Sequence, residues 1–289
     1  MENQENKHEA ITGKCIVVAA DRTADHITND IDELHQLEVL QAADAPIATN
    51  TDFVLHKAAS RGHADHGWLQ SYQTFSFADY YNPERMHFGV LRVLNDDILD
   101  PSKGFGRHPH DNMEIISIPL EGDLEHEDSM GNKAIIRNGD VQAMTAGTGI
   151  FHTEYNKNDD QKAKFLQIWL FPKSKNSTPR YDQVSFNVAE RHNNLQQILS
   201  PDSGDAGVTI NQDAWFHIGK FDQDFVTKYT IKKTGNGVYI FVLNGEFHIN
   251  GHTLNKRDGL GLWNLNDIPI HALTPDAEIL IMDIPMAIL

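Results

Sequence analysis

Cysteine is almost absent from this chain of 289 residues, in which Cys15 is the only one. A single thiol cannot close an intrachain disulfide, so a disulfide scaffold is excluded and a reducing compartment is favoured. No window approaches the ~18 consecutive apolar residues that a membrane span requires. The first fifteen residues also lack the basic start and apolar run of a secretory signal. These absences predict a cytoplasmic protein without a membrane partner.

Positive charge is also scarce. Lys and Arg number 24 against 41 Asp and Glu, which gives a net charge of −17. Such a surface repels nucleic-acid phosphates, so direct nucleic-acid binding is not expected. Hydrophobic residues nevertheless make up 40% of the chain and aromatics 9%, enough to build cores. The length accommodates two domains.

From residue 56 onward, short apolar or alternating runs recur with turn signals between them, and no long amphipathic helices separate them. Three of the turns contain Gly122, Gly131 and Gly139, the last within an Asn-Gly pair that favours tight hairpins. Short strands at regular spacing predict an all-β sandwich or barrel. Pro119 lacks an N–H and is expected at an edge or a bulge.

The β texture is interrupted once, by a stretch rich in Pro, Ser, Gly and Asn at 172–213. After it, residues 238–251 resemble 113–128 in layout, with an apolar strand, a Gly-centred turn and a second strand. We therefore predict two antiparallel β-barrel domains. Their expected limits are 56–175 and 176–289.

Residues 1–55 are expected to form an N-terminal extension. Residues 13–20 could make a short strand, and the spacing of apolar residues over 28–41 predicts an amphipathic helix. We find no chemistry in this segment. A docking or dimerising role is one reading of it.

Two pairs of metal-ligating residues stand out in the first predicted barrel. His108 and His110 are two residues apart, as are His152 and Glu154. Because residues i and i+2 of a strand point to the same face, each pair can face one metal ion. Imidazole and carboxylate together suit Fe(II), Mn, Ni, Co or Zn better than Ca or Mg. Glu114 competes for the carboxylate place, because it shares strand parity with His110 if the strand is regular.

Several nearby residues have less specific readings. A single histidine is most often a satisfied structural residue, and His87 and His126 are expected to be structural or to line a pocket. Three apolar side chains are candidates to contact flat rings, with a simple core position as the alternative: Phe105, Met144 and Phe151. Arg107 could attract an anionic substrate or form a surface salt bridge.

The sequence resembles the pirin family of the cupin superfamily over about residues 57–289. The motifs that carry the resemblance are residues 61–97, GFGRHPHDNMEI, LEGDLEHEDSMGN, MTAGTGIFHTEYN and DGLGLWN. The cupin pattern is matched by His108, His110, Glu114, Gly149, His152 and Asn156. In pirins the metal is bound by the H-x-H pair, the later histidine and the glutamate two residues beyond it. The resemblance therefore implies His108, His110, His152 and Glu154 as ligands.

The resemblance further implies a bicupin fold and a dioxygenase that opens flavonols such as quercetin with O2 and releases carbon monoxide. Fe(II) is the first candidate metal, with Mn, Co, Ni, Cu or Zn as alternatives. Glu154 is the expected base and Glu114 its reserve. The second barrel contains four histidines but no H-x-H pair, so no metal is expected there: His217, His248, His252 and His271.

Two other functions stay open. Pirins can also act as metal- and redox-dependent regulators that bind transcription or metabolic proteins, so a protein partner is one alternative. A metal-dependent enzyme acting on a different small substrate is the other.

Overall fold

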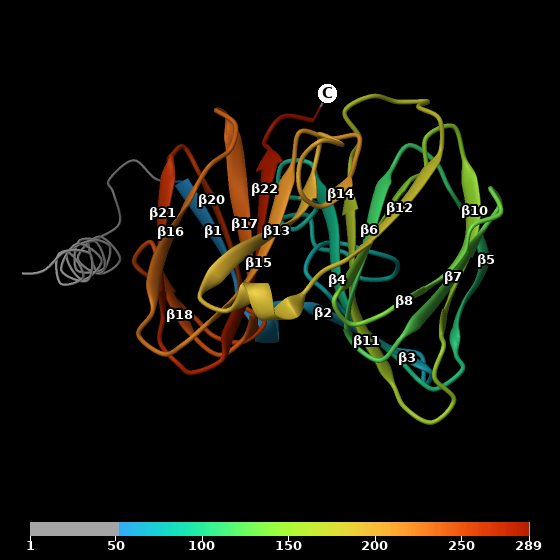
Figure 1. Cartoon of the computed structure of the whole chain (residues 1–289), viewed down its shortest axis with the longest axis horizontal. Helices are drawn as coiled ribbons and strands as arrows, with labels where there is room; N and C mark the ends of the chain where they lie inside the picture. The colour runs from blue at the N-terminus through green and yellow to red at the C-terminus, as the bar shows by residue number, and fades with distance from the viewer. Residues whose placement is uncertain (1–51, 289) are drawn as a thin grey trace, which may run out of the picture. The chain divides into compact units, whose positions relative to one another are not determined.

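The structure, a computed structural model, describes residues 52–288. The strand expected at 13–20 and the helix expected at 28–41 lie outside the described residues. The described part consists of β-strands with two short 3-10 helices, η1 (Ala58–Ser60) and η2 (Val188–Arg191) (Figure 1). Neither helix has the length and apolarity that crossing a membrane requires. The all-β prediction is confirmed.

The first half of the described chain contains two antiparallel sheets. The seven-stranded sheet has the order β12 (Arg180–Ser185), β9 (Asp140–Thr145), β6 (Glu114–Glu121), β11 (Ala163–Leu170), β4 (Leu91–Leu99), β3 (Leu69–Gln73), β2 (Gly62–Asp65). The four-stranded sheet has the order β5 (Gly104–His110), β10 (Ile150–Asn156), β7 (Leu124–Asp128), β8 (Lys133–Ile136).

The second half repeats this plan. Its seven-stranded sheet has the order β1 (Asp52–His56), β20 (Gly259–Trp263), β17 (Asn236–Asn244), β22 (Ala277–Pro285), β15 (Trp215–Phe221), β13 (Asn194–Ser200), β14 (Val208–Thr209). Its four-stranded sheet has the order β16 (Val226–Thr230), β21 (Asp267–Ala272), β18 (Phe247–Ile249), β19 (His252–Leu254). Both halves have the jelly-roll-like arrangement of a cupin.

Strand membership places two segments differently from the expected limits. β1 precedes all of the first half in sequence, yet it pairs with β20 of the second half. Val54 and Leu55 of β1 pack against the cores there, which explains why the strand joins that sheet. β12 follows residue 175, yet it pairs with β9 of the first half.

A shared apolar core joins the two seven-stranded sheets. Ile116 and Ile168 of the first sheet belong to the same buried cluster as Phe216 and Phe241 of the second. Because side chains alternate along a strand, each of these sheets has a second face that points into its own half.

These inner faces differ sharply. In the first half, a row of polar residues crosses five neighbouring strands in register: Gln73, Asn95, Gln167, Ser117 and Gln142. In the second half the inner face is mostly apolar, with Ile240 and Ile281 among its members, and the buried polar residue His217 lies opposite Ile281. Apolar side chains offer no metal ligands, whereas the polar row of the first half can surround a polar site.

The turn glycines behave as their sequence context predicts. Gly122, Gly131 and Gly139 have φ values of 71°, 93° and 95°, which side chains with a Cβ rarely adopt. Pro119 lies where the pairing of β6 with β11 shifts register. The missing N–H of Pro119 is therefore accommodated at an irregularity, as expected.

Candidate metal centre

The strand pair β5–β10 brings the two predicted ligand pairs together. His108 lies opposite His152, and His110 lies opposite Ile150. At the other end of the pair, a Cβ on Gly104 would lie 2.1 Å from the carbonyl oxygen of Glu154. Only glycine permits this close approach of the two strands.

Three imidazoles converge at this place. The ring centroids of His108 and His152 are 4.4 Å apart, and that of His110 lies 4.8 Å from each of them. One nitrogen from each ring lies within 4.8 Å of the others. Such spacing suits three ligands around one ion.

The hydrogen bonds of these rings leave nitrogens free to bind a metal. Nδ1 of His108 lies 2.7 Å from the carbonyl oxygen of Gly106 and therefore donates to it, which leaves Nε2 unprotonated in the neutral ring. Nε2 of His152 is buried and has no hydrogen-bond partner. An orphaned buried nitrogen is costly unless it binds something, and a transition-metal ion fits this donor set.

Burial also favours the neutral rings that metal binding requires. It lowers the pKa of His152 to about 3, with the nearby His108 as the next cause. It lowers the pKa of His110 to about 4, again with neighbouring histidines contributing. Both rings are therefore unprotonated lone-pair donors at neutral pH.

Glu154 is buried next to this triad, and its carboxylate is held on both sides. Ser117 donates to Oε1 at 3.0 Å, and the Gln167 amide donates to Oε2 at 2.8 Å. The pairing of β10 with β5 shifts register between His152 and Glu154. A carboxylate oxygen of Glu154 forms a second group with His126 and His152, whose candidate ligand atoms lie within 4.8 Å of one another.

Glu114 lies elsewhere, and the expectation that it shares a face with His110 is wrong. β5 ends at His110, whereas Glu114 begins β6 in the other sheet. Asn112 between them has a φ of 47°, so strand parity does not continue through the turn. The Glu114 carboxylate accepts hydrogen bonds from Thr145 and from the backbone N–H of Asn211, in the second half.

A cavity of about 280 Å³ adjoins His108, His110 and Glu154. Its remaining walls come from β3, β4, β11 and nearby loops. Aromatic and apolar side chains form one part of the lining: Leu69, Phe77, Phe105 and Trp169. Polar side chains form another: His66, Ser71, Gln73, Asn95, Asp97 and Gln167.

Sequence reasoning missed most of these walls. A usable signal existed, because Asn95 and Asp97 are polar and share a face of β4 whose other residues, Leu91, Val93 and Leu99, are apolar. Asp97 is buried, and burial raises its pKa to about 7, with the charges of Asp96 and Glu154 adding to the effect. The cavity therefore contains a carboxyl group that changes charge near neutral pH.

Of the residues predicted to contact the substrate, one lines the cavity and the others lie in the core or on the surface. Phe105 lines the cavity as predicted. Met144 is instead fully buried in a small core cluster with Ile115. Phe151 is 41% exposed, and Arg107 lies over its ring at 4.0 Å, which places this pair on the protein surface.

Two family models match this chain, one in each half. Residues 54–170 match the family model described as pirin, and residues 197–284 match that of the quercetinase C-terminal cupin domain. A quercetin 2,3-dioxygenase of Escherichia coli is 43% identical over 231 residues, covering 80% of this chain and 98% of the relative. The chain belongs to the pirin family.

Other relatives agree with this membership. A pirin-like protein of Caulobacter vibrioides is 40% identical to this pirin, covering 77% of the chain and 95% of the relative. The crystal structure of the bacterial pirin YhhW from Escherichia coli in complex with nickel(II) is 42% identical, with a TM-score of 0.76. It covers 81% of this chain and 99% of the other.

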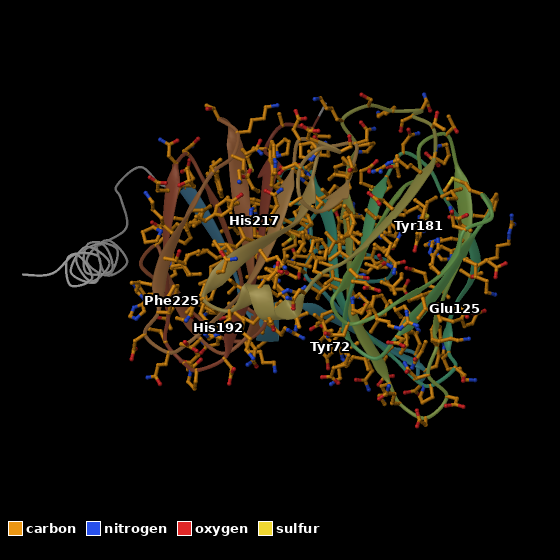
Figure 2. All side chains as sticks on the ribbon, viewed as in Figure 1. Tyr72, Glu125, Tyr181, His192, His217 and Phe225 are labelled. Carbon is orange, nitrogen blue, oxygen red and sulfur yellow. The ribbon has the colours of Figure 1, made fainter. Side chains whose placement is uncertain are left out.

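Within residues 52–288 of this pirin, both groups of side chains that could hold a metal lie in the first half. His217 of the second half is buried among aromatic and apolar neighbours, with the ring of Tyr229 at 5.1 Å. Figure 2 marks it on that half, and it marks Tyr181 on the first. Tyr181 packs on His126, with ring centroids 4.9 Å apart.

Proposed function

We propose that this pirin is a metal-dependent dioxygenase that opens the heterocyclic ring of flavonols such as quercetin. The observation that carries the proposal is the convergence of His108, His110 and His152, of which the first two line a cavity that is partly aromatic and partly polar. The names of the relatives supply the reaction class. The proposal extends that class to this chain because the histidines and the cavity are compatible with it.

The proposed ligands are His108, His110, His152 and Glu154, around one divalent transition metal. Fe(II) is our first candidate, and Mn, Co, Ni, Cu or Zn are the alternatives. When bound, such an ion supplies Lewis-acid stabilisation of an oxyanion at the substrate. The three neutral imidazoles add no charge, so Glu154 alone offsets part of the positive charge of the ion.

The residues of the chain would bind and orient the flavonol. Trp169 and Phe105 offer aromatic faces to flat rings, while Asn95 and Gln73 offer amide groups to ring hydroxyls. Trp169 also meets the ring of His110 edge-on at 4.9 Å. A flat substrate in the cavity would therefore lie directly beside the histidines.

Glu154 is the proposed base for the 3-hydroxyl group of the flavonol. Its two oxygens are already held by Ser117 and Gln167, so the carboxylate is oriented before substrate arrives. Loss of the proton makes the flavonol electron-rich and reactive toward O2. The organic product would gain both atoms of O2 and lose one ring carbon with its oxygen as carbon monoxide, so no further reductant is needed.

The test combines elemental analysis of protein purified without added metal with a flavonol assay. We expect the flavonol absorption band to bleach only when O2 is present, with release of one carbon monoxide per substrate. Glu154→Gln should abolish turnover. Absence of O2 uptake with quercetin after loading with each of the six candidate metals would refute the proposal.

A further inference from the structure

Two buried polar residues of β7, His126 and Asp128, stand next to the ligand strand without belonging to the proposed ligand set. Their side chains alternate inward along β7, where His126 is 0% exposed and Asp128 8%. β7 pairs with β10, so that His126 lies opposite Glu154 and Asp128 opposite His152. Two titratable side chains are thus buried directly beside the metal centre.

Two long hydrogen bonds connect these residues to His152 in a chain. Nε2 of His126 lies 3.4 Å from Oδ2 of Asp128. Nδ1 of His126 lies 3.5 Å from Nδ1 of His152. Both nitrogens of His126 are therefore engaged, one with a carboxylate and the other with a neighbouring imidazole.

Asp128 is fixed from its other side. Its Oδ1 accepts from the backbone N–H groups of Met130 at 2.8 Å and Asn132 at 3.1 Å. Its Oδ2 accepts from the side-chain amide of Asn132 at 2.8 Å. These bonds hold the carboxylate in one orientation, with Oδ2 directed at His126.

The direction of each hydrogen bond follows from these contacts. A carboxylate can only accept, so Nε2 of His126 carries the proton and donates to Asp128. A His126 ring with a single proton then accepts at Nδ1, so Nδ1 of His152 donates. The remaining nitrogen of His152 is Nε2, which is buried and has no other partner.

We propose that Asp128 and His126 are positioning residues that hold His152 in its Nδ1–H tautomer and thereby keep its Nε2 ready to bind the metal. The proposal rests on the metal site proposed above. It assigns His126 an orienting role, although a nitrogen of His126 also lies within 4.8 Å of potential ligand atoms of His152 and Glu154. Ligation by His126 would break one of its two contacts, and the chain would no longer reach His152.

Asp128→Asn is the decisive variant. The two backbone N–H groups require an oxygen at the position of Oδ1, so the new NH2 group must replace Oδ2 and face His126. The side-chain amide of Asn132, which donates to Oδ2 in the wild type, must then turn its oxygen toward the NH2 group. An NH2 group donates, which forces Nε2 of His126 to accept and moves its proton to Nδ1. His152 must then accept at Nδ1 and carry its proton on Nε2, where it blocks the metal.

The measurements are imidazole ¹⁵N NMR of the metal-free protein and titration with Ni(II) against a competing chelator. In the wild type we expect His152 protonated on Nδ1 and His126 on Nε2. In Asp128→Asn we expect both tautomers exchanged and Ni(II) affinity lowered about 10- to 100-fold, the usual cost of losing an outer partner of a ligand. Glu127→Gln is the matched control, because this neighbouring carboxylate is exposed and bonded to Lys133, and its affinity should stay within twofold of wild type.

Changes at His126 separate orientation from ligation. His126→Gln keeps one acceptor and one donor and should retain most of the affinity, whereas His126→Leu should lose it as Asp128→Asn does. Loss of Ni(II) binding in His126→Gln with full binding in Asp128→Asn would make His126 a ligand and overturn the proposal. A wild-type spectrum with His152 protonated on Nε2 would overturn it even if no variant folded. Failure of the wild type to bind any metal would instead count against the proposed function, because the tautomers are measured without metal.

Discussion

His108 and His152 lie opposite each other on β5 and β10, with ring centroids 4.4 Å apart and Nε2 of His152 buried without a partner. This relationship joins segments that are more than forty residues apart in sequence. It makes His152 the buried member of the triad and the residue whose removal should be least tolerated.

His152→Gln should therefore lower Ni(II) affinity at least about a hundredfold, more than the loss of an outer partner would. The amide cannot replace an imidazole nitrogen at the same place. His63→Gln is the control, because His63 is an exposed histidine on β2 and should leave affinity unchanged. Chelator competition measures both, and equal affinity of His152→Gln and wild type would remove His152 from the ligand set.

Substitutions of the two buried glutamates should have different effects on flavonol turnover. Glu154→Gln should abolish flavonol turnover, whereas Glu114→Gln should retain kcat within about threefold, because Glu114 belongs to a different sheet from His108 and His110. In Glu114→Gln, an amide oxygen can still accept from Thr145 and Asn211. Loss of turnover in Glu114→Gln with normal folding and metal content would return Glu114 to the catalytic set.

The burial of Glu114 should also affect how the stability of the protein depends on pH. Burial raises its pKa to about 7 from an ordinary value of 4.5. Between these two pH values the native state binds the proton more strongly than the unfolded state. The contribution of Glu114 to the free energy of unfolding therefore falls as pH rises, by at most about 1.4 kcal/mol per pH unit. Urea unfolding of metal-free protein at pH 5 and pH 8 should therefore favour Glu114→Gln over wild type more at pH 8. An equal difference at both pH values would contradict the raised pKa.

Much of the proposed metal centre is predictable from sequence because it depends on local geometry. The i, i+2 spacing of His108–His110 and of His152–Glu154 sets their side chains on one face of a strand, and this holds in any β-sheet. Glu114 shows that strand parity fails across a turn. A single residue with positive φ, Asn112, redirects the chain into another sheet and cancels parity.

The cavity and the outer partners were not predictable in the same way. Gln73, Asn95 and Gln167 form one row only because three strands align in register. Local sequence patterns do not predict the register between strands that are distant in sequence. The pairing of β1 with β20, at the far end of the sequence, has the same origin. The nearly continuous apolar runs of β17 and β22, by contrast, already indicate strands that are buried on both faces.

Asp97 should impose a pH dependence on substrate binding. Its pKa is raised to about 7, so the carboxyl is neutral below this pH and negative above it. A second negative charge beside Glu154 disfavours an anionic flavonol, so KM should rise as pH increases through 7. In Asp97→Asn this rise should disappear while KM below pH 6 stays near the wild-type value. Identical KM profiles for the two proteins would show that ionisation of Asp97 does not govern flavonol binding.

His217 should make the metal-free protein sensitive to acid through the second half. Burial lowers its pKa to about 3, with the charge of Lys232 as a smaller cause, and its Nδ1 is buried without a partner. The unfolded chain binds this proton near pH 6.5 and the native state does not, so stability is present above pH 6.5 and falls as pH drops toward 3. His217→Leu removes this penalty, so its stability relative to wild type should improve by about 2 kcal/mol between pH 8 and pH 5.

Urea unfolding with a chelator present measures the change in stability. The value at pH 8, where the ring is neutral in both states, gives the packing cost of the substitution. The ligand histidines titrate equally in both proteins and cancel, so a difference that does not vary with pH would show that the pKa of His217 is not lowered in the native state.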